Sequence, residues 1–151
     1  MGYYRRMQNT KRSEATEQET VISWCEYAAL RYPELDLIYH IPNGGSRNKL
    51  EAANLKRQGV KAGVPDLNLP VPMNGFHGLF IEMKFGKNKT TKKQEEWLEQ
   101  LQKQGYKTAV CYGAYEAIGT IKQYLGIERK AKNEENSSRD GKLDSENVAE
   151  R

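Results

Sequence analysis

The chain has 151 residues, enough for one domain with a hydrophobic core, and no apolar run approaches the roughly 20 residues that cross a membrane. Basic residues number 24 against 20 acidic ones, and this net charge of +4 suits a polyanionic partner without establishing one. The N-terminus lacks the apolar segment of a signal peptide, and Cys25 and Cys111 fit no zinc motif. We therefore expect a cytoplasmic protein with reduced core thiols.

The two ends of the chain differ in composition from its middle. Residues 1–12 are polar and basic, which indicates a flexible arm. From residue 128 onward the chain is rich in Lys, Glu, Asn, Ser and Asp and has almost no apolar side chains. We therefore predict a folded domain over residues 13–127 and a disordered polar tail over 128–151.

The first half of this domain reads as helix, strand and helix. Ser13 can cap a helix over 14–32, whose apolar residues recur with helical spacing until Pro33. Residues 35–41 alternate in polarity and are rich in β-forming residue types, which predicts a strand. After the turn Pro42-Asn43-Gly44-Gly45, a second helix is expected over 46–58, with Leu50, Ala53 and Leu55 facing inward.

The chain is organised around two short segments, 63–67 and 79–84, joined by a turn-rich connection. Each has strand character, so we expect the two to pair. Side chains alternate along a strand, so Glu82 and Lys84 should share one face while Ile81 and Met83 take the other.

The remaining elements complete an α/β fold. A basic loop over 86–93 contains an N-capping threonine, and the helix that follows, to about residue 104, should turn Trp97, Leu98 and Leu101 inward. A strand over 106–112 and a helix over 114–125 come next. The predicted fold class is a mixed central β-sheet flanked by helices.

Charged residues on the central strands suggest a metal site. If Asp66 lies beside Glu82, two carboxylates and Lys84 converge, and such a group suits a hard divalent cation that polarises a phosphate. Taken alone, Glu82 and Lys84 could be an ion pair on an exposed sheet face, and Asp66 a turn residue after proline.

The pattern of Pro65-Asp66 followed by Glu82-Met83-Lys84 resembles the PD-(D/E)xK nucleases. Four blocks in order also resemble the VRR-NUC family, especially the small stand-alone members that phages and prophages encode. The blocks are Ile41–Arg47, Gly59–Asp66, Ile81–Lys84 and Gln94–Leu98. The resemblance covers roughly residues 14–125 and implies a restriction-endonuclease-like fold.

The resemblance also implies roles for individual residues. Asp66, Glu82, the backbone carbonyl of Met83 and a first-helix glutamate would bind Mg²⁺ or Mn²⁺. Glu14 best matches that glutamate, with Glu17 and Glu19 as alternatives. Lys84 would position or deprotonate water, or neutralise developing charge, and Gln94 would orient the water or a phosphate oxygen.

Candidate DNA contacts fall in two places. One is a turn that leads into a helix, where backbone amides favour anions; a purely structural turn explains it nearly as well. The other is the basic loop, whose simpler explanation is a solvated surface. The DNA-binding candidates are Asn43, Gly44, Arg47, Lys87, Lys89, Lys92 and Lys93.

The resulting functional prediction is a metal-dependent, structure-selective DNA endonuclease that hydrolyses phosphodiester bonds in branched DNA such as Holliday junctions. The likeness to stand-alone relatives implies a homodimer, since a two-fold dimer presents matching sites to two equivalent strands. Alternatives are a monomeric nuclease on linear or flap DNA, and a non-catalytic DNA-binding protein of the same fold. Apolar residues available for an interface include Tyr32, Leu35, Tyr106, Tyr112 and Tyr124.

Overall fold

The computed structural model describes residues 11–43 and 49–127. In chain order the elements are α2 (Glu14–Ala28), the 3₁₀ helix η1 (Pro33–Leu37), β1 (Tyr39–His40), α3 (Lys49–Arg57), β2 (Leu67–Leu69), β3 (Leu79–Lys84), α4 (Lys92–Lys103), β4 (Lys107–Tyr112) and α5 (Ala114–Leu125).

The four strands form one mixed sheet in the order β1-β2-β3-β4. The β1–β2 and β2–β3 pairs are antiparallel, whereas β3 and β4 are parallel and are joined through α4. Helices flank the sheet, so the predicted α/β class with a mixed central sheet is confirmed.

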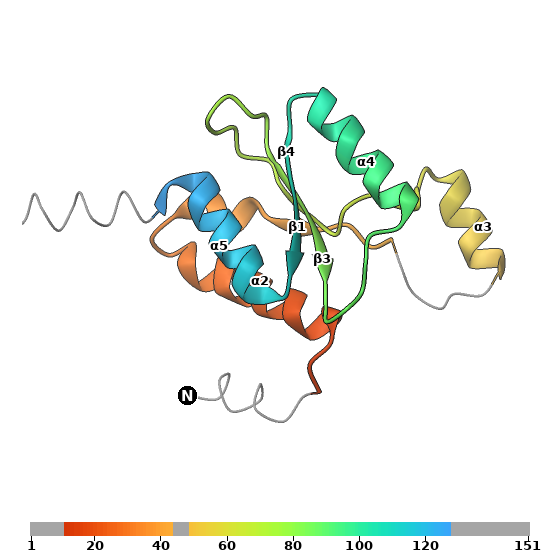
Figure 1. The fold of residues 1–151 in the computed structure, drawn as a ribbon, viewed down its shortest axis with the longest axis horizontal. Coiled ribbons are helices and arrows are strands. Elements are labelled where there is room, and N and C mark those ends of the chain that lie inside the picture. The colour runs from red at the N-terminus through yellow and green to blue at the C-terminus, as the bar shows by residue number, and fades with distance from the viewer. Residues whose placement is uncertain (1–10, 44–48, 128–151) are drawn as a thin grey trace, which may run out of the picture.

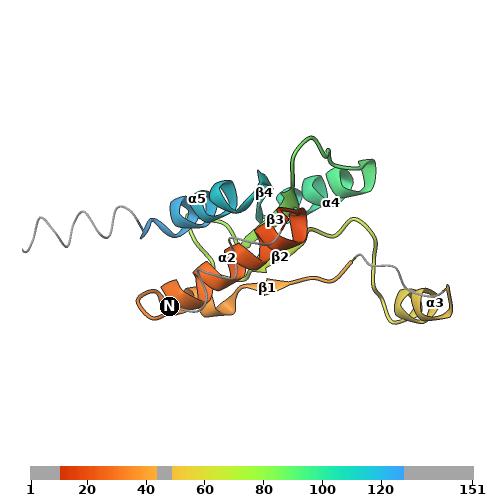
Figure 2. The same ribbon diagram turned by 90° about the horizontal axis from the view of Figure 1, so that it is seen from below.

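The main hydrophobic core lies between the sheet and two helices, α2 and α5, which lie side by side (Figures 1 and 2). Each helix contributes a stripe of apolar residues at helical spacing, and the strands contribute every second residue. Residues of the core include Val21, Cys25, Leu67, Leu69, Leu79, Ile81, Met83, Cys111, Ala117, Ile121 and Leu125.

Strand alternation then decides where the polar residues of β3 lie. Ile81 and Met83 are in the core that faces α2 and α5, so Glu82 and Lys84 occupy the opposite face, as predicted. Helix α4 lies on that opposite face, where the Gln94 side chain donates a hydrogen bond to Glu82. The candidate site is therefore enclosed between β3 and the start of α4.

The strand predicted over residues 35–41 is wrong for most of its length. Pro33 starts the 3₁₀ helix η1 instead, because its fixed φ suits the first position of a helical turn. Leu35 is fully buried from this turn, and its backbone N–H bonds to Tyr32 O at 3.0 Å. Only Tyr39 and His40 pair with β2.

The first strand of the central pair begins later than predicted, at Leu67 rather than residue 63. Gly63 has a left-handed backbone conformation, with φ of +90°, and Pro65 lacks the N–H that a sheet requires. Residues 63–66 therefore form a loop that enters β2. The prediction for β3 was correct in both position and length.

Helix α3 projects away from the sheet (Figures 1 and 2). Leu50 is 73% exposed and Ala53 is also exposed, so the expectation that this helix turns both inward is wrong. Helical spacing of apolar residues predicts a helix, but the packing partner depends on the fold. The predicted N-terminal turns of this helix, 46–48, lie outside the described residues.

The C-terminal half follows the predictions closely. Thr91 caps α4 through a capping box, β4 pairs with β3, and α5 has the predicted bounds. Both cysteines are buried and free. Residues 1–10 of the predicted arm and all of the predicted tail lie outside the described residues. Within the described part of the chain, no helix is long and apolar enough to cross a membrane.

Candidate active site

Asp66 reaches the site because it stands one residue before the paired strands. Leu67 pairs with Ile81 in an antiparallel register, so Asp66 aligns with the position of Glu82. Its Oδ2 atom accepts a hydrogen bond of 2.8 Å from the backbone N–H of Met83. Its backbone oxygen accepts from the N–H of Ile41 at 2.7 Å and from His40 Nδ1 at 2.9 Å. Asp66 is therefore fixed between β1 and β3.

Glu82 and Lys84 form a buried ion pair on β3. The distance from Lys84 Nζ to Glu82 Oε1 is 2.7 Å, and the two residues are 5% and 1% exposed, respectively. Removing both charges from water is costly, and hydrophobic residues of similar size would often be as stable here. The pair is therefore no surface ion pair, which was one of the alternatives for these residues.

One oxygen of Glu82 is left without a hydrogen-bond partner among the described residues. Oε1 accepts from Lys84 and from Gln94 Nε2, at 2.7 and 2.5 Å, whereas Oε2 is buried and unpaired. A buried unpaired carboxylate oxygen is unfavourable and needs an explanation such as a bound ion or water. Oε2 is thus an available ligand atom.

The electrostatics of Glu82 favour a cation. Burial above all raises the pKa of this carboxyl to about 7; Lys84 acts to lower it, and the charges of Asp66 and Glu14 act to raise it. Asp66 and Glu14 thus repel the charged form of the buried Glu82 carboxylate. A divalent cation would relieve their repulsion.

Gln94 connects the site to the start of α4. Its Oε1 atom accepts a hydrogen bond from the backbone N–H of Thr91 at 2.8 Å, which completes the helix cap. Its Nε2 atom donates to Glu82. The Gln94 side chain therefore holds Glu82 in place from the first turn of α4. The sequence did not predict this contact.

The three glutamates at the start of α2 have different surroundings. Glu14 is near enough to Glu82 to raise its pKa. Glu17 is buried and bonded to Arg12 and to the backbone N–H of Ala114, at 2.7 and 2.9 Å. Glu19 is exposed. This arrangement favours Glu14 as the third carboxylate at the site.

The donor set suits a hard cation only in part. Among residues 11–43 and 49–127, no three His, Cys, Asp or Glu side chains are grouped closely enough to hold a metal ion as they stand. Asp66 and Glu82 supply carboxylate oxygens and β3 supplies backbone carbonyls, all of the type that Mg²⁺ and Mn²⁺ prefer. The unpaired Glu82 Oε2 is the observation that supports a fit.

The loop before Asp66 is held by two close contacts. Asn43 Nδ2 donates to Val64 O at 2.5 Å, so this residue has a structural contact whatever it does with DNA. A Cβ atom on Gly63 would lie 2.8 Å from the backbone of Lys93, so only glycine fits. The start of α4 and the loop that carries Asp66 are thus locked together.

The four lysines predicted to contact DNA are all exposed. Lys87 and Lys89 are exposed in the loop after β3, and Lys92 and Lys93 are exposed in the first turn of α4. Lys92 Nζ lies 4.0 Å from Glu96 Oε1. Gly44 and Arg47 lie outside the described residues. The DNA-binding roles of all these residues stay predictions.

Asn68 is a polar residue near the site that the sequence analysis did not single out. It is 7% exposed, two residues after Asp66 on the same face of β2. Its Nδ2 atom donates to Tyr39 Oη at 2.7 Å, and its buried Oδ1 has no partner among the described residues. The sequence did contain one signal for it, because an amide side chain between two leucines of a strand is unusual.

The comparisons with known proteins agree on one family. The model of the VRR-NUC domain matches residues 7–115, well over half of the chain. The chain belongs to the VRR-NUC family. A solved structure described as a VRR_NUC domain protein is 36% identical, with a TM-score of 0.66 over 78% of this chain and 91% of that one. No curated protein gives a significant match.

The VRR-NUC domain is of nuclease type, which implies DNA as a binding partner. The matched region contains Asp66, Glu82, Lys84, Gln94 and the start of α2, and it ends at the first turn of α5. The family match therefore covers every described residue that the sequence analysis placed at the metal site.

Proposed function

We propose that this VRR-NUC protein is a metal-dependent, structure-selective endonuclease that hydrolyses phosphodiester bonds in branched DNA, such as Holliday junctions, as a homodimer. The observation that carries the proposal is the buried Glu82 carboxylate. One of its oxygens is bonded to Lys84 and the other is unpaired, next to the charges of Asp66 and Glu14.

In this proposal, each carboxylate has a defined role. Asp66 and Glu82 hold Mg²⁺ or Mn²⁺, and Glu14 and the backbone carbonyl of Met83 contribute to the same site. Gln94 keeps Glu82 in its orientation, because its amide bonds to Oε1 and leaves Oε2 free. The Met83 N–H performs the same task for Asp66 through Oδ2.

The chemistry would follow that of the PD-(D/E)xK nucleases. A bound divalent cation would act as a Lewis acid that activates water and stabilises charge on the phosphate and on the leaving oxygen. Lys84, held by Glu82 at 2.7 Å, would stabilise negative charge on the phosphate as an ammonium, or would accept a proton from the attacking water as a neutral amine.

A dimer would explain how one small domain cuts a four-way substrate. A two-fold dimer presents two sites to two equivalent strands. Among the residues predicted for an interface, Leu35 and Tyr124 are 0% and 5% exposed and belong to the core, so they are not available. Tyr112, at 44%, remains available, and Leu30 and Tyr115, which were not among the predicted residues, are exposed at 85% and 92%.

The experiment is a cleavage assay on labelled DNA of several shapes, with Mg²⁺, Mn²⁺ or EDTA. A four-way junction, a flap, a splayed duplex and a linear duplex of matched sequence are compared. We expect metal-dependent cleavage that is fastest on the junction. Asp66→Ala, Glu82→Ala and Lys84→Ala should each lower the rate by at least about a hundredfold while junction affinity is retained.

Three results would argue against parts of the proposal. Undiminished cleavage in EDTA would show that cleavage needs no metal ion and would contradict the proposed metal site. A folded protein that binds DNA and never cuts it would support a non-catalytic binder. A monomer in light scattering, free and on a junction, with equal rates on linear duplex, would overturn the dimer and junction assignments and leave a simple nuclease. If the dimer is correct, a mixed dimer with one Glu82→Ala subunit should only nick the junction.

A further inference from the structure

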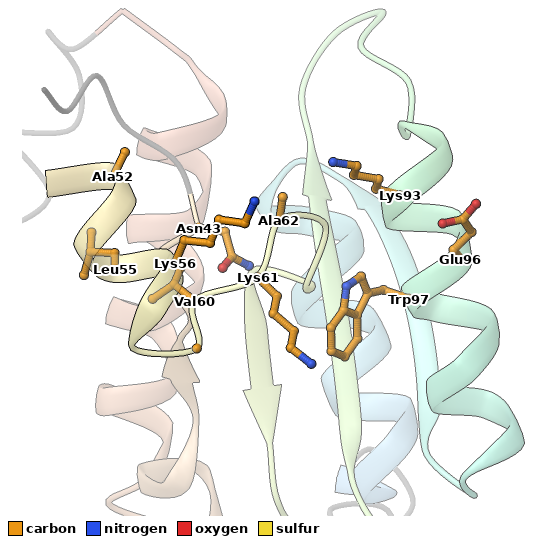
Figure 3. A pocket seen from close by; sticks show the side chains of 11 residues that line it. Asn43, Ala52, Leu55, Lys56, Val60, Lys61, Ala62, Lys93, Glu96 and Trp97 are labelled. Carbon is orange, nitrogen blue, oxygen red and sulfur yellow. The ribbon is translucent and has the colours of Figure 1, made fainter. Parts of the chain in front are cut away.

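An open pocket lies between the projecting helix α3 and helix α4 (Figure 3). Its volume is about 740 Å³, within the range of about 300–1,000 Å³ that is typical of ligand sites. Leu55 lines it from α3 and Trp97 from α4, with the segment 59–62 between them. Trp97 was predicted to face inward, yet it is only half-buried and lines this pocket.

The face that Trp97 presents is set by the register of α4. Gln94 and Leu98, four residues apart, turn toward the sheet, where Gln94 bonds to Glu82 and Leu98 is buried. Lys93 and Trp97, also four apart, occupy the neighbouring stripe of the helix and line the pocket. One helix therefore carries the catalytic contact on one stripe and the pocket on the next.

The lining combines an aromatic ring with positive charge. Three lysines line the pocket, Lys56, Lys61 and Lys93, against one acidic residue, Glu96. Lys61 Nζ lies 5.9 Å from the centroid of the Trp97 ring (Figure 3). Aromatic rings flanked by cations are the usual arrangement in sites for single-stranded nucleic acid, because bases stack on the ring while phosphates contact the cations.

Three contacts connect the residues that line the pocket to the candidate active site. The pocket residue Asn43 donates to Val64 O in the loop that carries Asp66. Gly63 packs directly on the backbone of Lys93. Gln94, next to Lys93, holds Glu82. The pocket lining and the carboxylates therefore share the loop that carries Asp66 and the start of α4.

We propose that this pocket binds an unpaired nucleotide of the DNA substrate, with its base stacked on Trp97 and its phosphates beside Lys56, Lys61 and Lys93. A base inside a duplex has both faces covered by its neighbours, so only an unpaired base offers a face to the ring. The inference rests on the proposed function for the identity of the polymer, and it adds a preference for branch points that carry unpaired bases.

The direct test uses Trp97 as its own reporter. Trp24→Phe leaves Trp97 as the single tryptophan, and Trp24 lies on α2 away from the pocket. A twelve-residue oligothymidylate is added in EDTA, so that no cleavage occurs. We expect saturable quenching of Trp97 fluorescence, weakened by salt, and little quenching by the matching duplex. No quenching, or equal quenching by the duplex, would overturn the proposal.

Substitutions separate stacking from charge. Trp97→Ala should weaken oligothymidylate binding by at least about fivefold, whereas Trp97→Phe should keep most of it. Lys61→Ala should weaken it and make it less dependent on salt. Lys103→Ala is the matched control, because Lys103 is an exposed lysine at the far end of α4, and it should bind as wild type does. If Trp97→Ala does not fold, Lys61→Ala and the fluorescence titration decide the matter.

A cleavage comparison distinguishes this inference from the nuclease proposal. Two junctions of the same sequence are used, one fully paired and one with two unpaired thymidines at the branch point. We expect wild type to prefer the second, and Trp97→Ala to lose that preference while still cutting the first. A preference unchanged in Trp97→Ala would overturn the pocket and leave the nuclease intact. If neither junction is cut, the nuclease proposal fails, and the titration still decides the pocket.

Discussion

The carboxylate of Glu17 caps helix α5 from across the fold: its Oε2 atom accepts a hydrogen bond of 2.9 Å from the backbone N–H of Ala114. Gly113, which begins that helix, has no side chain to cap it, and a Cβ atom there would lie 3.1 Å from Glu17 Oε2. A carboxylate at a helix N-terminus is favoured by the helix dipole. Glu17 therefore fixes the start of α2 to the start of α5.

Glu17→Gln should lower the free energy of unfolding by about 1 kcal/mol at pH 7, a typical loss for a helix cap. The hydrogen bond from Arg12, together with that from Ala114, holds the pKa of Glu17 below its usual value despite its burial. A lowered carboxyl pKa stabilises the fold above pH 4.5 and loses that effect as pH falls. Urea denaturation at pH 7 and at pH 3 should show the difference from wild type shrinking in acid; a constant difference would contradict this assignment.

Glu14→Gln and Glu19→Gln test which glutamate of α2 serves the site. Glu14 raises the pKa of Glu82, whereas Glu19 is exposed. Glu14→Gln should reduce junction cleavage by at least about tenfold without lowering stability, because it removes a carboxylate from a repulsive group. Glu19→Gln should cleave as wild type does. The reverse result in a single-turnover assay would exchange their roles.

The pH dependence of stability reports on Glu82. Burial raises its pKa to about 7, and a raised carboxyl pKa gives a stabilising effect that is complete below pH 4.5 and lost as pH rises through 7. In EDTA, the unfolding free energy of wild type minus that of Glu82→Gln should therefore fall by about 3 kcal/mol between pH 4.5 and 8. Comparing the two proteins cancels the constant cost of altering the Lys84 pair. A flat difference would show that Glu82 has an ordinary pKa.

Metal binding should stabilise the protein as well as activate it. A ligand that binds only the folded state at a hundred times its Kd adds about 2.7 kcal/mol to the unfolding free energy. Saturating Mg²⁺ or Mn²⁺ should therefore raise the Tm of wild type. Asp66→Ala, which loses a proposed ligand, should show a much smaller rise. An equal rise in both proteins would place the metal elsewhere.

Gly63→Ala tests the contact between the Asp66 loop and α4. The alanine would adopt an unfavourable φ of +90° and place its Cβ 2.8 Å from the backbone of Lys93. We expect a loss of at least about 2 kcal/mol in stability, and slower cleavage because Asp66 shifts. Gly59→Ala is the control, since Gly59 has φ of +100° and nothing within 4 Å of its Cβ. The stability of Gly59→Ala should fall only by the cost of the backbone strain, and its cleavage rate should stay that of wild type. Equal effects of the two substitutions would show that the contact has no special role.

The sequence alone was sufficient for the parts of the fold with strong local signals. The alternation of Ile81 and Met83 with Glu82 and Lys84 predicted β3 and the face of each side chain, because one face of a strand must be buried. Thr91 and the apolar spacing of the last helix predicted the start of α4 and the whole of α5. The same blocks of residues carried the resemblance to the VRR-NUC family, which the family model bears out.

Only the tertiary structure decided matters that depend on residues far apart in the sequence. Among three glutamates in the first two turns of α2, it bonded Glu17 to Ala114 and brought Glu14 near Glu82, a choice that no local pattern encodes. It also left α3 projecting from the sheet and Trp97 of α4 beside a pocket, although the apolar residues of α3 and α4 have the spacing of buried helices. Helical periodicity shows which residues share a face, but the packing of other elements determines whether that face is buried.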